Sequence, residues 1–222
     1  MLGFILSKMN LLILVVSIFA IVAFFTFGLI DIVKVKEAQL LLDRVLTKAS
    51  SVASSPAYCF SDSHTFPRSL DVSGQEFYYV MKISVTQFEK ELPSGPETIS
   101  KVIFSVFPRR DLVKSINDPS YIPKAIAAKS FETKAEVTLF SQDYLGDEYG
   151  GIGTLRELAT DTGESVYIDP QARVPMDSIQ LVKEIKRGQS SLYIFPCSVG
   201  PTCNAIKSSV GESVYPGVGF TC

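Results

Sequence analysis

The sequence carries no charged residue between Lys8 and Asp31, and most of the positions in between are Leu, Ile, Val, Phe or Ala. About twenty apolar residues in a helix, each rising 1.5 Å, cover the roughly 30 Å hydrocarbon core of a bilayer. We therefore expect a transmembrane helix over residues 9–31, preceded by a short tail over residues 1–8. A cleaved signal peptide is the alternative, but its apolar region would be shorter and would end in small residues three apart.

The helical pattern continues past the apolar run, through residues 32–55. Pro56 is the first proline of the chain and disfavours helix in the residue before it. Six apolar residues recur three and four positions apart, which is the spacing of a packed helix seam: Val35, Ala38, Leu42, Val45, Ala49 and Val52. This seam packs against the chain's own globular domain or also against copies of itself, and the two interpretations are compatible.

The remaining residues, 56–222, predict a β-rich head outside the membrane. Strand-forming residues dominate several stretches that are separated by Gly and Pro. We expect strands over residues 76–86, 99–107, 131–139, 164–168 and 192–195. Ile179 to Ile185 reads as a short amphipathic helix, and residues 201–222 read as a loop held by disulfides. The predicted fold class is α+β, a long N-terminal helix carrying a β-rich head.

The four cysteines, Cys59, Cys197, Cys203 and Cys222, all follow the apolar run. Two disulfides in an extracytoplasmic head account for them most simply. We favour Cys197–Cys203, which closes a short loop, and Cys59–Cys222, which ties the start of the head to residue 222. Pairing of Cys59 with Cys197 or Cys203 stays open. Zinc is a weaker alternative, because five residues separate Cys197 from Cys203 and the chain has a single histidine.

Other chemistry-bearing residues favour no catalytic, cofactor or metal site. The only histidine, His64, lies in a polar stretch and is expected to be an exposed loop residue. Gly150–Gly153 does not match a phosphate-binding loop, and the order of Asp143, Asp147 and Glu148 does not match an EF-hand. A net charge of −2 offers no basic field for nucleic acid. We expect a protein that is not an enzyme; a membrane-anchored enzyme is the least favoured class.

The layout of residues 9–86 resembles that of type IV pilin-like proteins, most nearly the archaeal kind. The helix end Val52–Pro56 leads to Thr65-Phe66-Pro67, then Gly74, and then the strand Phe77-Tyr78-Tyr79-Val80. In those proteins a half-embedded, half-amphipathic helix carries a β-rich head. Their leader peptide is cut just before the apolar run, behind basic residues, a pattern that neither Gly3 nor Lys8-Met9 matches.

The resemblance implies a structural subunit of a surface filament or appendage, self-associating through its N-terminal helix. From the residues themselves we expect no cofactor. Extracted helices would pack laterally and bury the apolar run against their neighbours. The alternative is a single-pass anchored extracytoplasmic domain that acts as an adhesin or as an accessory subunit of a membrane complex. Localisation is thus expected at the membrane, with the head outside, or in an extracellular filament.

Overall fold

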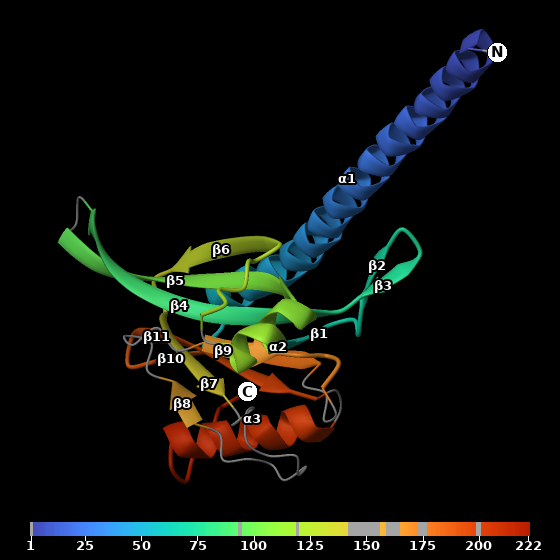
Figure 1. The fold of residues 1–222 in the computed structure, drawn as a ribbon. Coiled ribbons are helices and arrows are strands. Elements are labelled where there is room, and N and C mark those ends of the chain that lie inside the picture. The colour runs from blue at the N-terminus through green and yellow to red at the C-terminus, as the bar shows by residue number, and fades with distance from the viewer. Residues whose placement is uncertain are drawn as a thin grey trace.

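A computed structural model describes most of the chain, namely residues 2–92, 95–118, 120–141, 156–158, 165–172, 177–198 and 201–222. One long helix leaves a β-rich head and projects far beyond it (Figure 1). The α+β class expected from the sequence is confirmed. The head forms around the C-terminal half of the helix.

The long helix, α1, spans Leu2–Ser54 and is helical at all 53 residues. At 1.5 Å per residue it is about 80 Å long. It begins before the apolar run, so residues 2–8 belong to the helix and do not form a separate tail. Its end agrees with the expectation from Pro56: the Ser55 amide donates to the Val52 carbonyl oxygen at 3.2 Å, and the chain then leaves the helix.

Two main sheets form the head. The five-stranded sheet has the strand order β1-β10-β11-β7-β8, and its pairs are antiparallel except for the parallel pair β11–β7. Its strands are β1 (Cys59–Thr65), β10 (Ser178–Lys186), β11 (Gln189–Cys197), β7 (Glu136–Ser141) and β8 (Arg156–Leu158). The four-stranded sheet is antiparallel, with the order β6-β5-β4-β9. Its strands are β6 (Ala127–Thr133), β5 (Gly95–Pro108), β4 (Tyr79–Leu92) and β9 (Ser165–Ile168).

A small hairpin and a short helix complete this part of the head. The hairpin joins β2 (Leu70–Val72) to β3 (Gln75–Phe77), and α2 (Arg109–Asn117) follows β5. Ser73 and Gly74 form the two-residue turn of the hairpin with φ of 56° and 81°. Two successive positive φ values match the twist of paired strands, and glycine adopts them without strain. The hairpin lies beside α1, near the point where the helix leaves the head (Figure 1).

The main hydrophobic core lies between the inner faces of the two sheets and the C-terminal half of α1. It contains Met81, Ile83 and Phe104 from the four-stranded sheet, and Leu181 and Ile194 from the five-stranded sheet. The helix contacts β6 and β1, which are edge strands of the two sheets. It therefore closes one open side of the sandwich and is a structural element of the head as well as a projection from it.

A second core lies on the opposite face of the five-stranded sheet. There α3 (Pro201–Val214) packs its Ile206 and Val210 against Phe195 and Val182. In Figure 1 this helix lies on the far side of the head from the point where α1 emerges. The five-stranded sheet is thus covered on both faces, by the main core on one and by α3 on the other.

Three local expectations were wrong. The predicted helix at Ile179–Ile185 is strand β10, whose residues Ser178–Glu184 are all buried. The predicted loop over residues 201–222 contains α3, which starts with Pro201, a residue favoured at the first position of a helix. The single strand expected over residues 131–139 is two strands, β6 and β7, which belong to different sheets.

Candidate functional site

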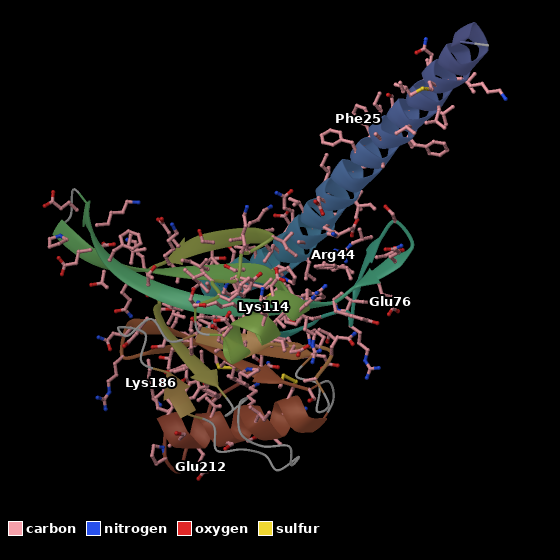
Figure 2. The ribbon with its side chains drawn as sticks, viewed as in Figure 1. Phe25, Arg44, Glu76, Lys114, Lys186 and Glu212 are labelled. Carbon is pink, nitrogen blue, oxygen red and sulfur yellow. A yellow bond between two sulfur atoms is a disulfide. The ribbon has the colours of Figure 1, made fainter. Side chains whose placement is uncertain are left out.

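The N-terminal half of α1 is an exposed apolar surface. Large apolar side chains cover all sides of this part of the helix: Met9, Leu11, Leu12, Ile13, Leu14, Val15, Val16, Ile18, Phe19, Ile21, Val22, Phe24, Phe25, Leu29 and Ile32. We call these residues the apolar belt. Figure 2 shows their side chains, including Phe25, standing away from the helix with no part of the head beside them. None of the most apolar part of α1 is buried.

An apolar belt of this size must be buried in an apolar environment and not left in contact with water. Burying one Leu, Ile or Phe side chain is worth about 1.5–3 kcal/mol, and water-soluble monomers rarely expose contiguous apolar patches of more than a few hundred Å². α1 has the length and composition of a membrane span. Lipid tails or other apolar helices are the two media that can cover side chains on every side of a helix.

Charged residues mark both ends of the belt. Lys8 precedes it, and Asp31 lies at its other end beside Ile32, with Lys34 one turn after Asp31; the Lys34 ammonium lies 3.0 Å from the Asp31 carboxylate. The Lys34 ammonium also lies over the Phe77 ring of β3, at 5.9 Å from its centroid. This contact places the β2–β3 hairpin at the level where the belt ends. The hairpin therefore lies against the charged boundary of the belt.

The predicted seam lies inside the protein's own head. Ala38, Leu42, Val45, Ala49 and Val52 are fully buried, and Val35 is half-buried. Their neighbours are core residues of the two sheets. The first of the two interpretations of the seam therefore holds, since five of its six residues face the head and leave no surface for a second copy. Any self-association of α1 must use the belt or the outer side of the helix.

Polar contacts reinforce this junction between helix and head. The Lys129 ammonium of β6 pairs with the Asp43 carboxylate of α1. Lys48 of α1 pairs with Asp62 of β1 at 3.2 Å and donates to the Ser63 carbonyl oxygen at 2.6 Å. One helix face is thus attached to edge strands of both sheets, which fixes the direction in which the belt projects.

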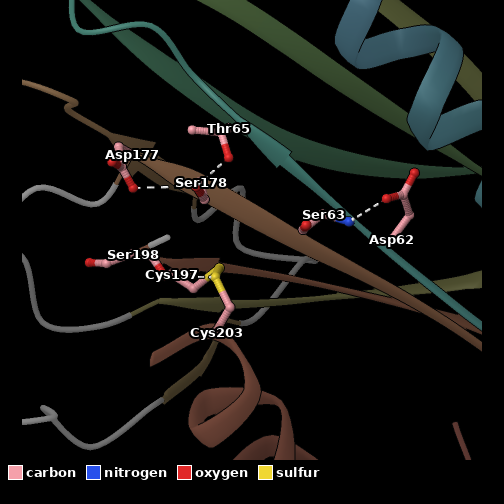
Figure 3. Close-up of a disulfide and its surroundings, with 8 residues drawn as sticks. All are labelled: Asp62, Ser63, Thr65, Asp177, Ser178, Cys197, Ser198 and Cys203. Carbon is pink, nitrogen blue, oxygen red and sulfur yellow. Dashed lines mark hydrogen bonds between the residues drawn. A yellow bond between two sulfur atoms is a disulfide. The ribbon is translucent and has the colours of Figure 1, made fainter. Parts of the chain in front are cut away.

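Two disulfides join the four cysteines. Cys197 bonds Cys203, and Cys59 bonds Cys222, the two pairs that the sequence analysis favoured. Figure 3 shows the first bond linking the end of β11 to the first turn of α3. Cysteines in disulfides are not available as thiolate ligands for zinc. Among the residues that the structure describes, no group of three or more His, Cys, Asp or Glu could hold a metal ion.

His64 does not lie in a loop. It belongs to β1, is half-buried, and packs edge-on against the Phe66 ring at 4.9 Å between centroids. Burial, and then the nearby Lys48 ammonium, lower the pKa of its imidazole. Its Nε2 is buried and has no hydrogen-bond partner among the described residues. Because the residues around His64 are polar, this strand was not predicted from the sequence. The antiparallel register of β1 with β10 sets the orientation of the His64 side chain.

A pocket that the sequence analysis did not anticipate lies between α3 and the segment that follows it. Its volume is about 500 Å³, and its lining residues are Asn204, Lys207, Ser208, Glu212, Gly217, Val218, Gly219, Phe220 and Cys222. Lys207 donates to the Ser61 hydroxyl at 2.9 Å and to the Cys222 carbonyl oxygen. Burial lowers the pKa of its ammonium. The remaining sequence candidates, Gly150–Gly153 and Asp143, Asp147 and Glu148, lie outside the described residues.

Comparisons with known proteins give no relative. Scans against protein-family models, curated proteins and solved structures found no match to this chain. The functional interpretation therefore depends on the belt, on the junction between helix and head, and on the disulfides.

Proposed function

We propose that this protein is a pilin-like structural subunit of a surface filament or appendage. In this role the apolar belts of many copies pack into a filament core, and the disulfide-bonded heads face outward. The observation that carries the proposal is the division of α1 into an exposed apolar half and a half that is a core element of its own head. A subunit with this division has an exposed apolar helix that can associate with other copies and a head that is already folded.

The disulfides and the junction between helix and head also support this role. Two disulfides indicate folding in an oxidising compartment, where surface filaments function. The seam and its polar contacts hold the belt in one direction relative to the head, so that repeated copies can adopt one repeated geometry. Burying the belt against neighbouring belts supplies a large driving force for assembly.

Electron microscopy combined with cross-linking tests the proposal. Single cysteines at Ile18, Phe19 and Ile21 point to different sides of α1, and a single cysteine at the exposed Lys124 on the head is the matched control. We expect fibres that bind an antibody against the head, and disulfide-linked dimers from at least one of the three belt positions. Absence of fibres, together with no cross-link from any belt position, would contradict the proposal.

A single-pass anchored ectodomain, acting as an adhesin or accessory subunit, is the second candidate. The charged residues Lys8 and Asp31 favour it, because the 23 helical steps between them span about 34 Å, close to the thickness of the hydrocarbon core. In that case the belt stays in lipid. The chain then remains in the membrane fraction after mechanical shearing of cells, whereas a filament subunit appears in the sheared material.

A further inference from the structure

The two disulfides differ in their exposure to solvent. Cys197 is fully buried and Cys203 is 7% exposed, and both belong to the core beneath α3. Cys222 is exposed and Cys59 is partly exposed. Because thiol–disulfide exchange requires a thiolate to reach a sulfur atom, the exposed bond reacts first with a reductant in solution.

The pocket gives access to the exposed bond. Cys222 lines it, together with the polar face of α3 that carries Asn204, Lys207 and Ser208. The Lys207 ammonium is hydrogen-bonded to the carbonyl oxygen of Cys222 itself. A cation beside a cysteine stabilises its thiolate and so favours departure of that sulfur from a mixed disulfide. The site therefore combines a pocket of about 500 Å³ with a cation hydrogen-bonded to the backbone of one of the two cysteines.

The segment that this bond retains, residues 215–222, packs on the outer face of the five-stranded sheet through aromatic and polar contacts. The Phe220 ring lies 5.1 Å from the Tyr193 ring between centroids, and the Tyr215 and Tyr193 hydroxyls are 2.9 Å apart. Thr221 donates to Glu184 Oε1 at 3.1 Å. All of these contacts belong to the second core or its rim. The main core, which contains the seam of α1, shares no residue with it.

We infer that the Cys59–Cys222 disulfide is a redox-sensitive latch, and that its reduction by a dithiol releases residues 215–222 from the head while the main core stays folded. One reductant thiolate bonds to Cys222 Sγ, and Cys59 leaves as a thiolate that takes up a proton. The second reductant thiol then displaces Cys222, leaving two cysteine thiols and one oxidised dithiol. Release opens the second core around Tyr193 to solvent and frees the carboxylate of Glu184.

Limited reduction of the full chain in detergent micelles tests the latch. The protein is treated with increasing dithiothreitol under native conditions, alkylated, and mapped by mass spectrometry. We expect Cys59 and Cys222 to be alkylated at least about tenfold faster than Cys197 and Cys203. Hydrogen exchange of the same samples is expected to rise in residues 215–222 and to stay unchanged in β4 and β5. Equal rates for all four cysteines would overturn the inference, as would fast reduction with unchanged exchange in residues 215–222.

A pair of matched variants isolates the latch from general reduction. Cys59→Ser with Cys222→Ser removes only the exposed bond, and Cys197→Ser with Cys203→Ser removes only the buried one. The first variant is expected to show fast exchange in residues 215–222 without any reductant. If hydrogen exchange of residues 215–222 in this variant equals that of the untreated parent, the disulfide does not hold the segment in place and the inference is wrong. If either variant fails to fold, the titration of the parent protein decides the question alone.

Discussion

The Lys183 ammonium, on strand β10, donates a hydrogen bond to the carbonyl oxygen of Ser55, the residue that follows α1. Lys183 is only 6% exposed, so its charge lies inside the head at the C-terminal end of the helix. The last carbonyl groups of a helix have no partner within it, and the helix dipole favours a cation there. Lys183, which lies far from α1 in the sequence, therefore caps the C-terminal end of α1 from within the five-stranded sheet.

Removal of this cap is expected to weaken the head. Lys183→Met keeps the aliphatic stem and leaves the Ser55 carbonyl oxygen without its donor, at an expected cost of about 1–2 kcal/mol. For a domain of this size the melting temperature falls by about 2–4 °C per kcal/mol. Thermal unfolding of the full chain in micelles measures the effect. Lys124→Met is the control, since Lys124 is exposed on the head; equal melting of the two variants contradicts a capping role for Lys183.

A charge in the seam is expected to unfold the head and not merely to impair assembly. Leu42 is fully buried, whereas Leu40, two residues earlier on the same helix, is 42% exposed. Leu42→Asp places a carboxylate in the main core and is expected to cost at least about 3 kcal/mol, while Leu40→Asp is expected to cost about 1 kcal/mol or less. Chemical denaturation of both variants checks this difference. Similar midpoints would show that the seam is not packed against the head.

Gly211 is expected to tolerate no side chain, because residues 215–222 fold back against it. A Cβ atom there would lie 2.7 Å from the backbone nitrogen of Phe220. Alanine gains about 1 kcal/mol of helix propensity over glycine, but the contact is with backbone, which cannot rotate away, and such overpacking costs about 1–3 kcal/mol. We expect Gly211→Ala to raise hydrogen exchange in residues 215–222. Gly28→Ala is the control, since a Cβ atom at Gly28 has nothing within 4 Å.

Stability is expected to fall below about pH 6.5 because of His64. The pKa of its imidazole is lowered in the folded protein, mainly by burial, from the ordinary value of 6.5. The unfolded chain therefore takes up this proton first as the pH falls, and stability is lost between pH 6.5 and the lowered pKa. Above pH 6.5 both states hold the neutral imidazole and the contribution is complete.

The His64 contribution is measured as a difference between two proteins. Melting temperatures of the parent and of His64→Gln are compared from pH 8 to pH 5, so that the carboxylates common to both cancel. The gap between the two curves should change below about pH 6.5 and stay constant above it. Since the chain has one histidine, its NMR titration reads the folded pKa directly. A folded pKa at or above 6.5 contradicts the burial argument.

The features that could be predicted from the sequence are those set by local pattern. The uncharged run and the three-and-four spacing of the seam are one-dimensional signals, and both correspond to α1. Strand β10 was mistaken for a helix because both of its faces are buried, so its apolar residues do not alternate. Helix α3 was missed because Gly211 and the following glycines suggest a loop, although Pro201 is a start signal.

The candidate sites likewise divide into those set by local sequence pattern and those formed by residues far apart in the sequence. The belt is visible as a run of apolar residues, and the pairing of Cys197 with Cys203 follows from their short separation. The pocket is formed by α3 and by residues 217–222 folding back on it, and the cap at Ser55 joins residues 128 positions apart. Contacts of that kind depend on the order of strands in the sheets, for which the sequence contains no local pattern.

The unbroken course of α1 has a mechanical consequence. Because the helix is continuous from Leu2 to Ser54, a displacement of its outer end is transmitted along the helix to the head. Tension between belt and head is carried as shear across the interdigitated side chains from Ala38 to Val52, in parallel with the single covalent path through Pro56. The part of α1 outside the head, about 50 Å from Leu2 to Val35, is thus a lever arm whose joint with the head is a packed layer of hydrocarbon.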